Sequence, residues 1–289
     1  MEEFRDRVAV VTGGASGIGL ALADRAAREG MSVVIADVEE VALRSAADTL
    51  RKHGGAVLAQ SVDVSHESEV EALAERVFQE FGAVHLFCNN AGVINRERPT
   101  WEHSIADWSW VLGVNVWGII HGIRSFVPRM LASGEEGHIV NTASMAGVIT
   151  GGMGNAVYDA SKHAVVSISE SLYRDLVVRQ TQVSASVLCP GAVSTKIFEA
   201  ERNRPADLGQ PEGDPPESRG TGMPADAFPP DEVANQVFDA VRENRFYVFA
   251  AQPPMLEWLK MGYDRMAEGK NPAVPRRLIA ARDAGQAPQ

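Results

Sequence analysis

The chain has 289 residues, of which 45% are hydrophobic, so it has enough apolar material for one large core. Its formal net charge is −11, and no cluster of Lys and Arg offsets this charge locally. Binding to nucleic acids and docking on anionic membranes both need clustered positive charge, so the composition argues against both kinds of partner.

The N-terminal segment is charged and leads directly into the first apolar run. We find no signal-peptide pattern and no apolar run long enough to span a bilayer, so we expect a soluble, cytoplasmic protein. Cys88 and Cys189 lie in apolar runs and are expected to be buried, reduced thiols. The seven histidines make no ligand spacing with Cys or carboxylates, so no metal site is predicted.

Short runs of apolar residues alternate with longer amphipathic stretches along the chain, as in parallel sheets covered on both faces. The predicted strands are Val8–Thr12, Ser32–Ala36, Ala56–Val62, Val84–Cys88, His138–Thr142, Val183–Leu188 and Phe246–Ala250. The predicted helices are 18–30, 39–53, 66–81, 104–133, 156–179, 231–243 and 254–267. This alternation predicts an α/β, single-domain Rossmann fold, a doubly wound parallel sheet of about seven strands with helices on both faces.

The domain organisation follows from where this pattern stops. We expect one Rossmann-type catalytic domain over residues 1–270 and a frayed tail over residues 271–289. Residues 199–230 are rich in Pro, Gly and charged residues and have almost no apolar periodicity. That stretch is either a solvated loop or part of a substrate lid over residues 193–230, since long irregular segments in compact domains are usually functional or disordered.

A glycine-rich turn separates the first predicted strand from the first predicted helix. It reads Gly13-Gly14-Ala15-Ser16-Gly17-Ile18-Gly19, with the spacing G-x-x-x-G-x-G. Glycines let a backbone approach a pyrophosphate closely, and the N-terminus of the following helix offers free N–H groups to it. The turn therefore indicates a dinucleotide site, although taken alone it is also compatible with a plain tight turn.

Asp37 closes the second predicted strand, 20 residues after Gly17. An acidic side chain at this place accepts hydrogen bonds from the adenosine ribose hydroxyls and repels a 2′-phosphate. Val38 beside it offers no positive charge, so the sequence favours NAD(H) over NADP(H). The alternative for Asp37 is an N-cap for the helix that starts near Glu39.

Further motifs follow in a fixed order along the chain. They are Thr12-Gly13-x-x-x-Gly17-x-Gly19, Asn89-Asn90-Ala91-Gly92, Asn115, Ser144, Tyr158-x-x-x-Lys162 and Pro190-Gly191. The ordered set resembles the classical short-chain dehydrogenase/reductase family over about residues 5–195, and the remainder resembles it only loosely. The resemblance implies an oxidoreductase that transfers a hydride between a nicotinamide cofactor and a secondary alcohol or ketone.

The resemblance also implies which residues contact the cofactor. Asp63-Val64 looks like the pair that contacts adenine, and Thr195 looks like the threonine that touches the nicotinamide carboxamide. The full set of expected cofactor-binding residues is Gly13, Ser16, Gly17, Ile18, Gly19, Asp37, Asp63, Val64, Asn90, Ala91, Gly92, Tyr158, Lys162, Pro190, Gly191, Val193 and Thr195.

Tyr158 and Lys162 are four residues apart in a helical pattern, so both side chains project from one face. A tyrosine hydroxyl has a pKa of ~10, and a nearby ammonium brings that pKa toward neutrality. The resemblance implies that Tyr158 is the general acid/base, and that Lys162 also holds the nicotinamide ribose. It further implies that Ser144 orients the substrate oxygen, and that Asn115 anchors a water that passes protons onward.

The chain departs from the family pattern at one point. Ser144 precedes Tyr158 by 14 positions, one more than is usual in the family. Residues 145–154 are glycine-rich and can absorb an extra residue, and position 145 holds neither Ser nor Thr, so Ser144 keeps its assignment. The departure concerns the shape of this loop and not the expected chemistry.

The resemblance points to four substrate-facing positions, which are Met145, Met153, Ile197 and Phe198. They favour an apolar, alicyclic or bulky alcohol or ketone, with core packing as the alternative for each of them. Two other functions remain open: an NADP-dependent carbonyl or ketoacyl-type reductase, and a redox-inactive dinucleotide-binding regulator on the same fold. A regulator would have no need of the four catalytic residues together. The family's usual assembly is a homotetramer, with dimers next.

Overall fold

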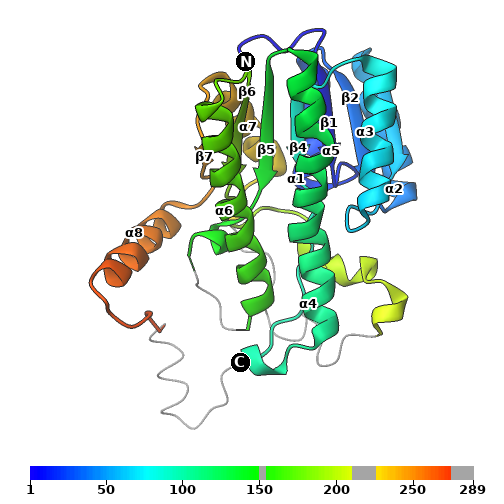
Figure 1. The fold of residues 1–289 in the computed structure, drawn as a ribbon. Helices are drawn as coiled ribbons and strands as arrows, with labels where there is room; N and C mark the ends of the chain where they lie inside the picture. The colour runs from blue at the N-terminus through cyan, green and yellow to red at the C-terminus, as the bar shows by residue number, and fades with distance from the viewer. Residues whose placement is uncertain (150–153, 210–225, 275–289) are drawn as a thin grey trace.

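Seven parallel strands form one sheet in the computed structural model, which describes residues 1–149, 154–209 and 226–274 (Figure 1). The strands are β1 Val8–Thr12, β2 Ser32–Asp37, β3 Val57–Ser61, β4 Leu86–Asn89, β5 Gly137–Thr142, β6 Val183–Leu188 and β7 Tyr247–Val248. Their order is β3-β2-β1-β4-β5-β6-β7, so the sheet grows in opposite directions from β1 and β4. The predicted doubly wound sheet of about seven strands is confirmed.

Helices cover both faces of the sheet because alternate strand residues point to opposite sides. Ala9 and Val11 of β1 pack toward α1 (Gly17–Arg28), α2 (Glu40–Leu50) and α7 (Pro230–Arg242). Val10 packs toward the other face. That face is covered by α3 (Glu67–Phe81), α5 (Gly118–Ser133) and α6 (Ala156–Val178).

The edge strand β7 is shorter than the sequence predicts, but the residues that flank it in the chain continue its backbone hydrogen bonds to β6 and the turn after it. The Phe246 carbonyl accepts from Val187 N–H at 2.8 Å, and the Ala250 carbonyl accepts from Gly191 N–H at 2.8 Å. The second of these bonds fixes the Pro190-Gly191 turn where β6 ends. Helix α8 (Pro253–Ala267) follows, projects from the body in orange, and packs on the core through Met255 and Leu259 (Figure 1).

The stretch predicted as one helix over 104–133 contains a π-helical turn. Helix α4 (Ile105–Leu112) begins with a capping box between Ser104 and Asp107, and α5 begins at Gly118. Between them Gly113–Trp117 forms the π-helical turn that carries the buried Asn115. Such turns re-aim side chains and are frequent at functional sites.

The same stretch, Ile105–Ser133, is long and apolar enough to cross a membrane by length and composition. The expectation that no apolar run is long enough to span a bilayer is therefore wrong for length and composition. In the described part of the chain 56% of its most apolar window is buried, because α5 packs against α3 and the sheet. A core helix passes the same test, so this finding is weak evidence for a membrane span.

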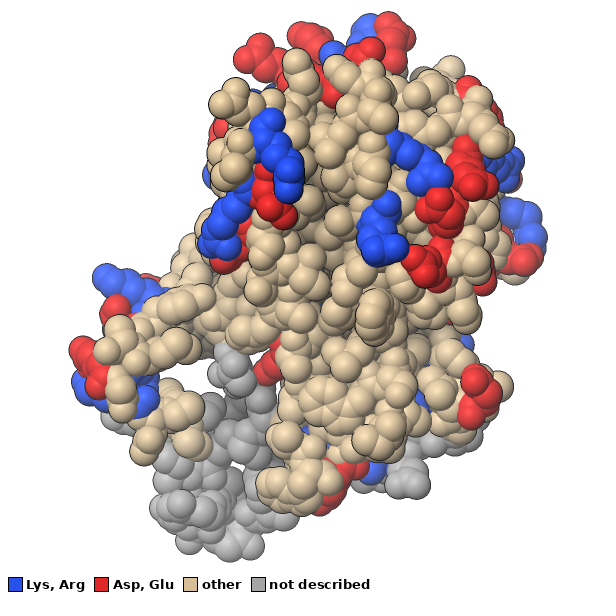
Figure 2. Space-filling view, in the orientation of Figure 1, with Lys and Arg blue, Asp and Glu red and all other residues tan. Residues whose placement is uncertain are grey.

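Charged side chains of both signs lie next to one another on the face shown in Figure 2. Arg129 of α5 contacts Glu71 of α3 at 2.6 Å, and Arg124 contacts Glu67 at 3.4 Å. The surface over α4 is mostly uncharged in this view. No continuous basic surface is visible on this face.

A tight contact joins α6 to the 3₁₀ turn Met145–Gly147, which follows β5. A Cβ placed on Gly147 would lie 2.5 Å from the carbonyl oxygen of Lys162, so the turn rests directly on the α6 backbone. This contact sets the distance between the β5 end and the face of α6 that carries Tyr158 and Lys162.

We therefore expect Gly147→Ala to lower the free energy of unfolding by about 1–3 kcal/mol, since two backbone segments must move apart. Gly262→Ala in α8 is the matched control, because a Cβ there meets nothing within 4 Å. Urea unfolding of both variants checks this. Equal stability of the two variants would contradict the close contact at Gly147.

Candidate active site

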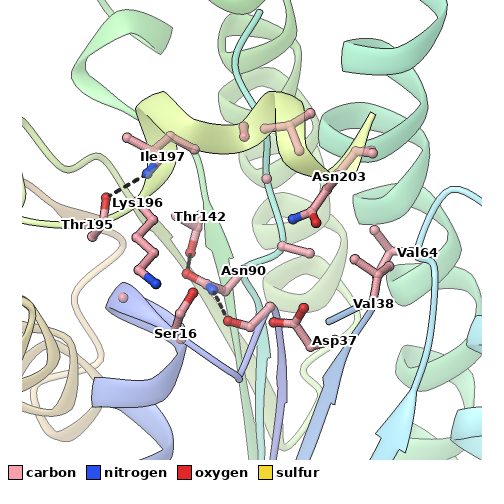
Figure 3. Close-up of a pocket in the computed structure, with 18 of the residues that line it drawn as sticks. Ser16, Asp37, Val38, Val64, Asn90, Thr142, Thr195, Lys196, Ile197 and Asn203 are labelled. Carbon is pink, nitrogen blue, oxygen red and sulfur yellow. Dashed lines mark hydrogen bonds between the residues drawn. The ribbon is translucent and has the colours of Figure 1, made fainter. Parts of the chain in front are cut away.

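A cavity of about 490 Å³ lies at the carboxyl ends of the strands, where the sheet switches direction between β1 and β4 (Figure 3). It extends from Asp37 and Val38 at one end to Ser144 and Tyr158 at the other. The expected residues that line it are Gly13, Ser16, Gly17, Ile18, Gly19, Asp37, Asp63, Val64, Asn90, Ala91, Gly92, Ser144, Tyr158, Lys162, Pro190, Gly191, Val193, Thr195 and Ile197.

The glycine-rich turn forms the floor of the cavity where β1 meets α1. Gly13 and Gly17 have φ angles of +64° and +53°, which glycine adopts readily. A Cβ on Gly13 would lie 2.9 Å from Ala91 Cα, and one on Gly19 would lie 2.0 Å from the Gly13 carbonyl oxygen. Side chains at these positions would therefore clash with the neighbouring backbone, so the turn keeps this shape only with glycine there. Ser16 precedes α1 and its side chain makes no capping hydrogen bond.

Thr12 ties the glycine-rich turn to the segment after β4. Its hydroxyl accepts from the N–H groups of Asn90 at 2.9 Å and Ala91 at 3.1 Å. The Asn90 amide donates to the Thr12 carbonyl at 3.0 Å. It also accepts from the Thr142 hydroxyl at 3.2 Å (Figure 3). Three strand ends are thus joined through one asparagine, which holds the cavity wall in place.

Asp37 connects the end of β2 to the glycine-rich turn. One carboxylate oxygen accepts from Ala15 N–H and the other from Glu39 N–H, both at 3.0 Å. The N-cap of α2 is Glu39, so the alternative of Asp37 as the helix N-cap is not what the structure shows. Asp37 lines the cavity, and a carboxylate oxygen can accept further hydrogen bonds there.

The 3₁₀ helix Ile197–Asn203 lies above the cavity in the view of Figure 3, and the 3₁₀ helix Ala206–Leu208 contributes Leu208 to the lining. The first helix brings Arg202 and Asn203 to the Asp37 end, where both donate to Glu39. The Lys196 side chain lies nearby and points toward Ser16 at the glycine-rich turn (Figure 3). Sequence reasoning missed these residues, since Arg202 follows Glu39 by 163 positions in a segment without periodicity.

Ser144 and Tyr158 meet at the other end of the cavity. The Ser144 oxygen accepts from Ala146 N–H at 3.1 Å, and its hydroxyl donates to the Pro190 carbonyl at 3.5 Å. Both Ser144 and Tyr158 line the cavity at this end, so the extra residue in the intervening loop keeps neither of them out of the site. Residues 150–153 of that loop, with Met153, lie outside the described residues.

Lys162 is buried and its Nζ donates to the Thr142 carbonyl at 3.1 Å. Its Nζ lies 5.6 Å from the ring centroid of Tyr158. Burial lowers the pKa of Lys162 to about 8. Burial also raises the pKa of Tyr158 to about 12, opposed by the Ser144 side chain and reinforced by the charge of Asp159.

The sequence predicts that the Lys162 ammonium lowers the Tyr158 pKa, and this direction is wrong for the structure as described. Loss of hydration raises the pKa of Tyr158 by more than the Lys162 ammonium lowers it, since that ammonium is hydrogen-bonded to the Thr142 carbonyl. Tyr158 thus stays protonated at neutral pH, in the form that donates a proton.

Asn115 lies behind the cavity wall and does not line it. Its side chain accepts from Val93 N–H at 2.8 Å and donates to the Val93 carbonyl at 2.9 Å and to Ser161 Oγ at 3.0 Å. A Cβ on Gly92 would lie 3.3 Å from Lys162 Nζ and 3.4 Å from Asn115 Oδ1. Because Gly92 has no side chain, Lys162 Nζ and Asn115 Oδ1 can both lie close to its Cα at this point of the cavity wall.

The four expected substrate-facing residues do not all lie at the cavity. Ile197 lines the cavity, whereas Met145 is buried in the core beside Val165 and Val187. Phe198 is 40% exposed and does not line the cavity. The apolar wall is formed instead by Val93, Trp110, Val114, Ala200, Pro205 and Leu208. Phe198 points away from the cavity because it follows Ile197 in a 3₁₀ helix, where neighbouring residues point in different directions.

The order of groups along the cavity suits a dinucleotide. A carboxylate lies at one end, a side-chain-free cradle at a helix N-terminus lies in the middle, and Tyr158 and Lys162 lie at the other end. These groups match ribose hydroxyls, a pyrophosphate, and a nicotinamide ribose with its reacting partner, in that order. Within the described ranges no group of three His, Cys, Asp or Glu residues could hold a metal ion.

Comparison with known proteins agrees with this geometry. A family profile described as short chain dehydrogenase matches residues 7–206. The 1-deoxy-11-beta-hydroxypentalenate dehydrogenase of Streptomyces exfoliatus is 40% identical over 86% of this chain and 84% of that protein. A CLA biosynthesis dehydrogenase/reductase of Lactiplantibacillus plantarum is 33% identical over 86% of this chain and 89% of that protein.

Among solved structures, a short-chain dehydrogenase/reductase from Burkholderia phymatum in complex with NAD superposes with a TM-score of 0.90. It is 41% identical, and the match covers 95% of this chain and 99% of that one. The LigD apo form from Sphingobium has a TM-score of 0.77 at 27% identity, covering 94% and 100%. The family profile, the relatives and the cavity lead to one conclusion, that this chain belongs to the short-chain dehydrogenase/reductase family.

Proposed function

We propose that this protein is an NAD(H)-dependent oxidoreductase that interconverts a secondary alcohol and a ketone, with Tyr158 as general acid/base. The observation that carries the proposal is one cavity with Asp37 at one end and Ser144 and Tyr158 together at the other. The substrate we propose is apolar and alicyclic or bulky. The apolar wall around Val93, Trp110 and Leu208 supports this choice.

Each region of the cavity has a proposed part in holding the cofactor. Asp37 accepts from the adenosine ribose, with Asp63 and Val64 near the adenine, and the glycine-rich turn receives the pyrophosphate. Lys162 holds the nicotinamide ribose, and Thr195 lies near the carboxamide. Bound NAD(H) supplies the hydride acceptor or donor, and the protein supplies the proton transfer. The solved relative with NAD bound supports this cofactor.

Proton transfer is the proposed task of the polar cluster around Tyr158. In alcohol oxidation the deprotonated form of Tyr158, the phenolate, accepts the substrate O–H proton as the carbon gives up its hydride; in ketone reduction the Tyr158 hydroxyl returns a proton to the oxygen and becomes the phenolate. Ser144 donates to the substrate oxygen and orients it for the transfer. Lys162 stabilises the phenolate that forms, and Asn115, behind Gly92, anchors a water that carries the proton onward.

A second candidate keeps the chemistry and changes the cofactor to NADP(H). The observation in its favour is Arg202, a cation at the Asp37 end of the cavity. Its guanidinium is already bonded to Glu39, so NAD(H) remains the first choice. We also propose a cytoplasmic location and a homo-oligomer, a tetramer or else a dimer, acting on a small molecule.

The proposal predicts turnover of secondary alcohols or ketones with NAD(H), and at least about a hundredfold loss of kcat in Tyr158→Phe. The loss follows because the variant has no proton to exchange at the reacting oxygen. A panel of linear, alicyclic and steroid-like substrates, followed by nicotinamide absorbance with NAD(H) and NADP(H) in parallel, measures both quantities. Tyr173→Phe is the matched control, since Tyr173 lies on the same helix and packs against Phe246.

Binding of NADH to both variants should stay close to wild type, which separates loss of chemistry from loss of fold. Wild-type turnover in Tyr158→Phe would refute the proposed acid/base. Firm NADH binding without turnover of any substrate in the panel would favour the redox-inactive regulator instead.

The raised pKa of Tyr158, about 12, makes a separate prediction for the pH dependence. Because the protonated form dominates below that pKa, kcat/KM for alcohol oxidation should rise between about pH 6 and pH 10. Over the same range ketone reduction should stay nearly flat, since its proton donor is already present. Initial rates in both directions check this, and oxidation that is independent of pH would contradict the raised pKa.

A further inference from the structure

An arginine from the segment after β6 reaches the adenosine end of the cavity. Arg202 Nη2 lies 2.6 Å and Nε 3.1 Å from the same oxygen of Glu39, and Nη1 donates to the Lys196 carbonyl at 3.0 Å. Asn203 donates to that Glu39 oxygen at 3.0 Å. All three nitrogens of the guanidinium thus have partners within the protein.

Glu39 is adjacent in space to the carboxylate that faces the ribose. Its backbone N–H donates to Asp37 at 3.0 Å, and Asp37, Glu39, Arg202 and Asn203 all line the cavity. The side chains of Glu39 and Arg202 are 30% and 32% exposed, so the ion pair borders the space where adenosine would lie. The hydrogen bond from Arg202 lowers the pKa of Glu39, which keeps the carboxylate ionised at neutral pH.

An arginine at this place would normally favour a 2′-phosphate, because its planar fork of N–H groups bonds phosphate oxygens in pairs. Here Glu39 takes up those donors and neutralises the charge. Any 2′-phosphate would have to displace Glu39 and would then leave its carboxylate without a partner, next to Asp37. The cost of that exchange falls on NADP(H) alone, since NAD(H) carries no phosphate there.

We propose that Glu39 is a specificity-determining residue, which holds Arg202 away from the 2′ position and so favours NAD(H) over NADP(H) together with Asp37. This inference rests on the proposed function, because it assumes a dinucleotide whose adenosine ribose lies at Asp37. If Asp37 alone excluded the 2′-phosphate, Arg202 would have no influence on the preference for NAD(H). Under this proposal, the effect of Glu39 on that preference depends on Arg202.

Loss of the Glu39–Arg202 pair should not detach the segment that carries Arg202, because that segment has two other anchors. Arg204 contacts Asp107 at 2.8 Å, and Arg96 contacts Glu201 at 2.7 Å. A change in nucleotide affinity in a Glu39 variant therefore reports on Arg202 itself. Glu40→Ala is the matched control: it removes the same charge one residue away, from a solvent-exposed pair with Arg44.

The test measures the Kd of NADH and NADPH by fluorescence titration at low ionic strength, and the Kd of 5′-AMP and adenosine 2′,5′-bisphosphate by calorimetry. We expect Glu39→Ala to tighten NADPH and the bisphosphate about tenfold, the size of one charge-assisted hydrogen bond. NADH and 5′-AMP should change much less, and Glu40→Ala should leave all four values near wild type. Adding Arg202→Gln to Glu39→Ala should abolish the gain.

The same variants in an Asp37→Ser background keep the test decisive if Asp37 masks the effect. No gain from Glu39→Ala in either background overturns the proposal. A gain that survives Arg202→Gln overturns it too, because the effect would then be simple repulsion by Glu39. If the wild-type protein binds neither NADH nor NADPH, the proposed function itself fails, an outcome that the wild-type titrations show separately.

Discussion

The close approach of two backbone segments at the switch point of the sheet is the constraint on which the site depends. The turn after β1 and the Asn90–Gly92 segment after β4 touch because Gly13 has no side chain, and the Thr12 hydroxyl holds them together. A cavity at the strand ends exists only while these segments stay in this register. Neither segment alone forms a site; the parallel order of β1 and β4 brings them together.

Electrostatics divides the cavity into two chemically different ends. At the Asp37 end Glu39 and Arg202 are partly exposed and paired with each other, so their charges carry a modest cost in solvation. At the Tyr158 end Lys162 is buried and pKa values shift because hydration is lost. The proposed selection of the nucleotide and the proposed transfer of the proton thus use groups in separate environments, joined by one glycine-lined floor.

Much of the fold and of the site can be predicted because the signals are local. A strand, a glycine-rich turn and a helix are adjacent in the chain, so sequence alone suffices to place Gly13, Gly17 and Asp37. Tyr158 and Lys162 share a helix face through their spacing. The predicted direction of the Tyr158 pKa is wrong since burial, which a motif does not encode, is stronger than the nearby charge.

What sequence does not predict is carried by tertiary contacts or by irregular helices. Arg202 meets Glu39 only after the chain has crossed the sheet, and the π-helical turn at Asn115 has no periodic signal in the sequence. Position along the chain assigns Met145 and Phe198 to the pocket, but the 3₁₀ turns that carry them direct one into the core and the other to solvent.

The burial of Lys162 bears on how this protein can evolve. An ammonium removed from water, with the Thr142 carbonyl as its hydrogen-bond partner, lowers the stability of the native state. An apolar side chain of similar length would fit the same space without that penalty. Selection for heat tolerance alone would therefore erode this position, whereas the catalytic role proposed for Lys162 would retain it, so durability and turnover would oppose each other at a single side chain.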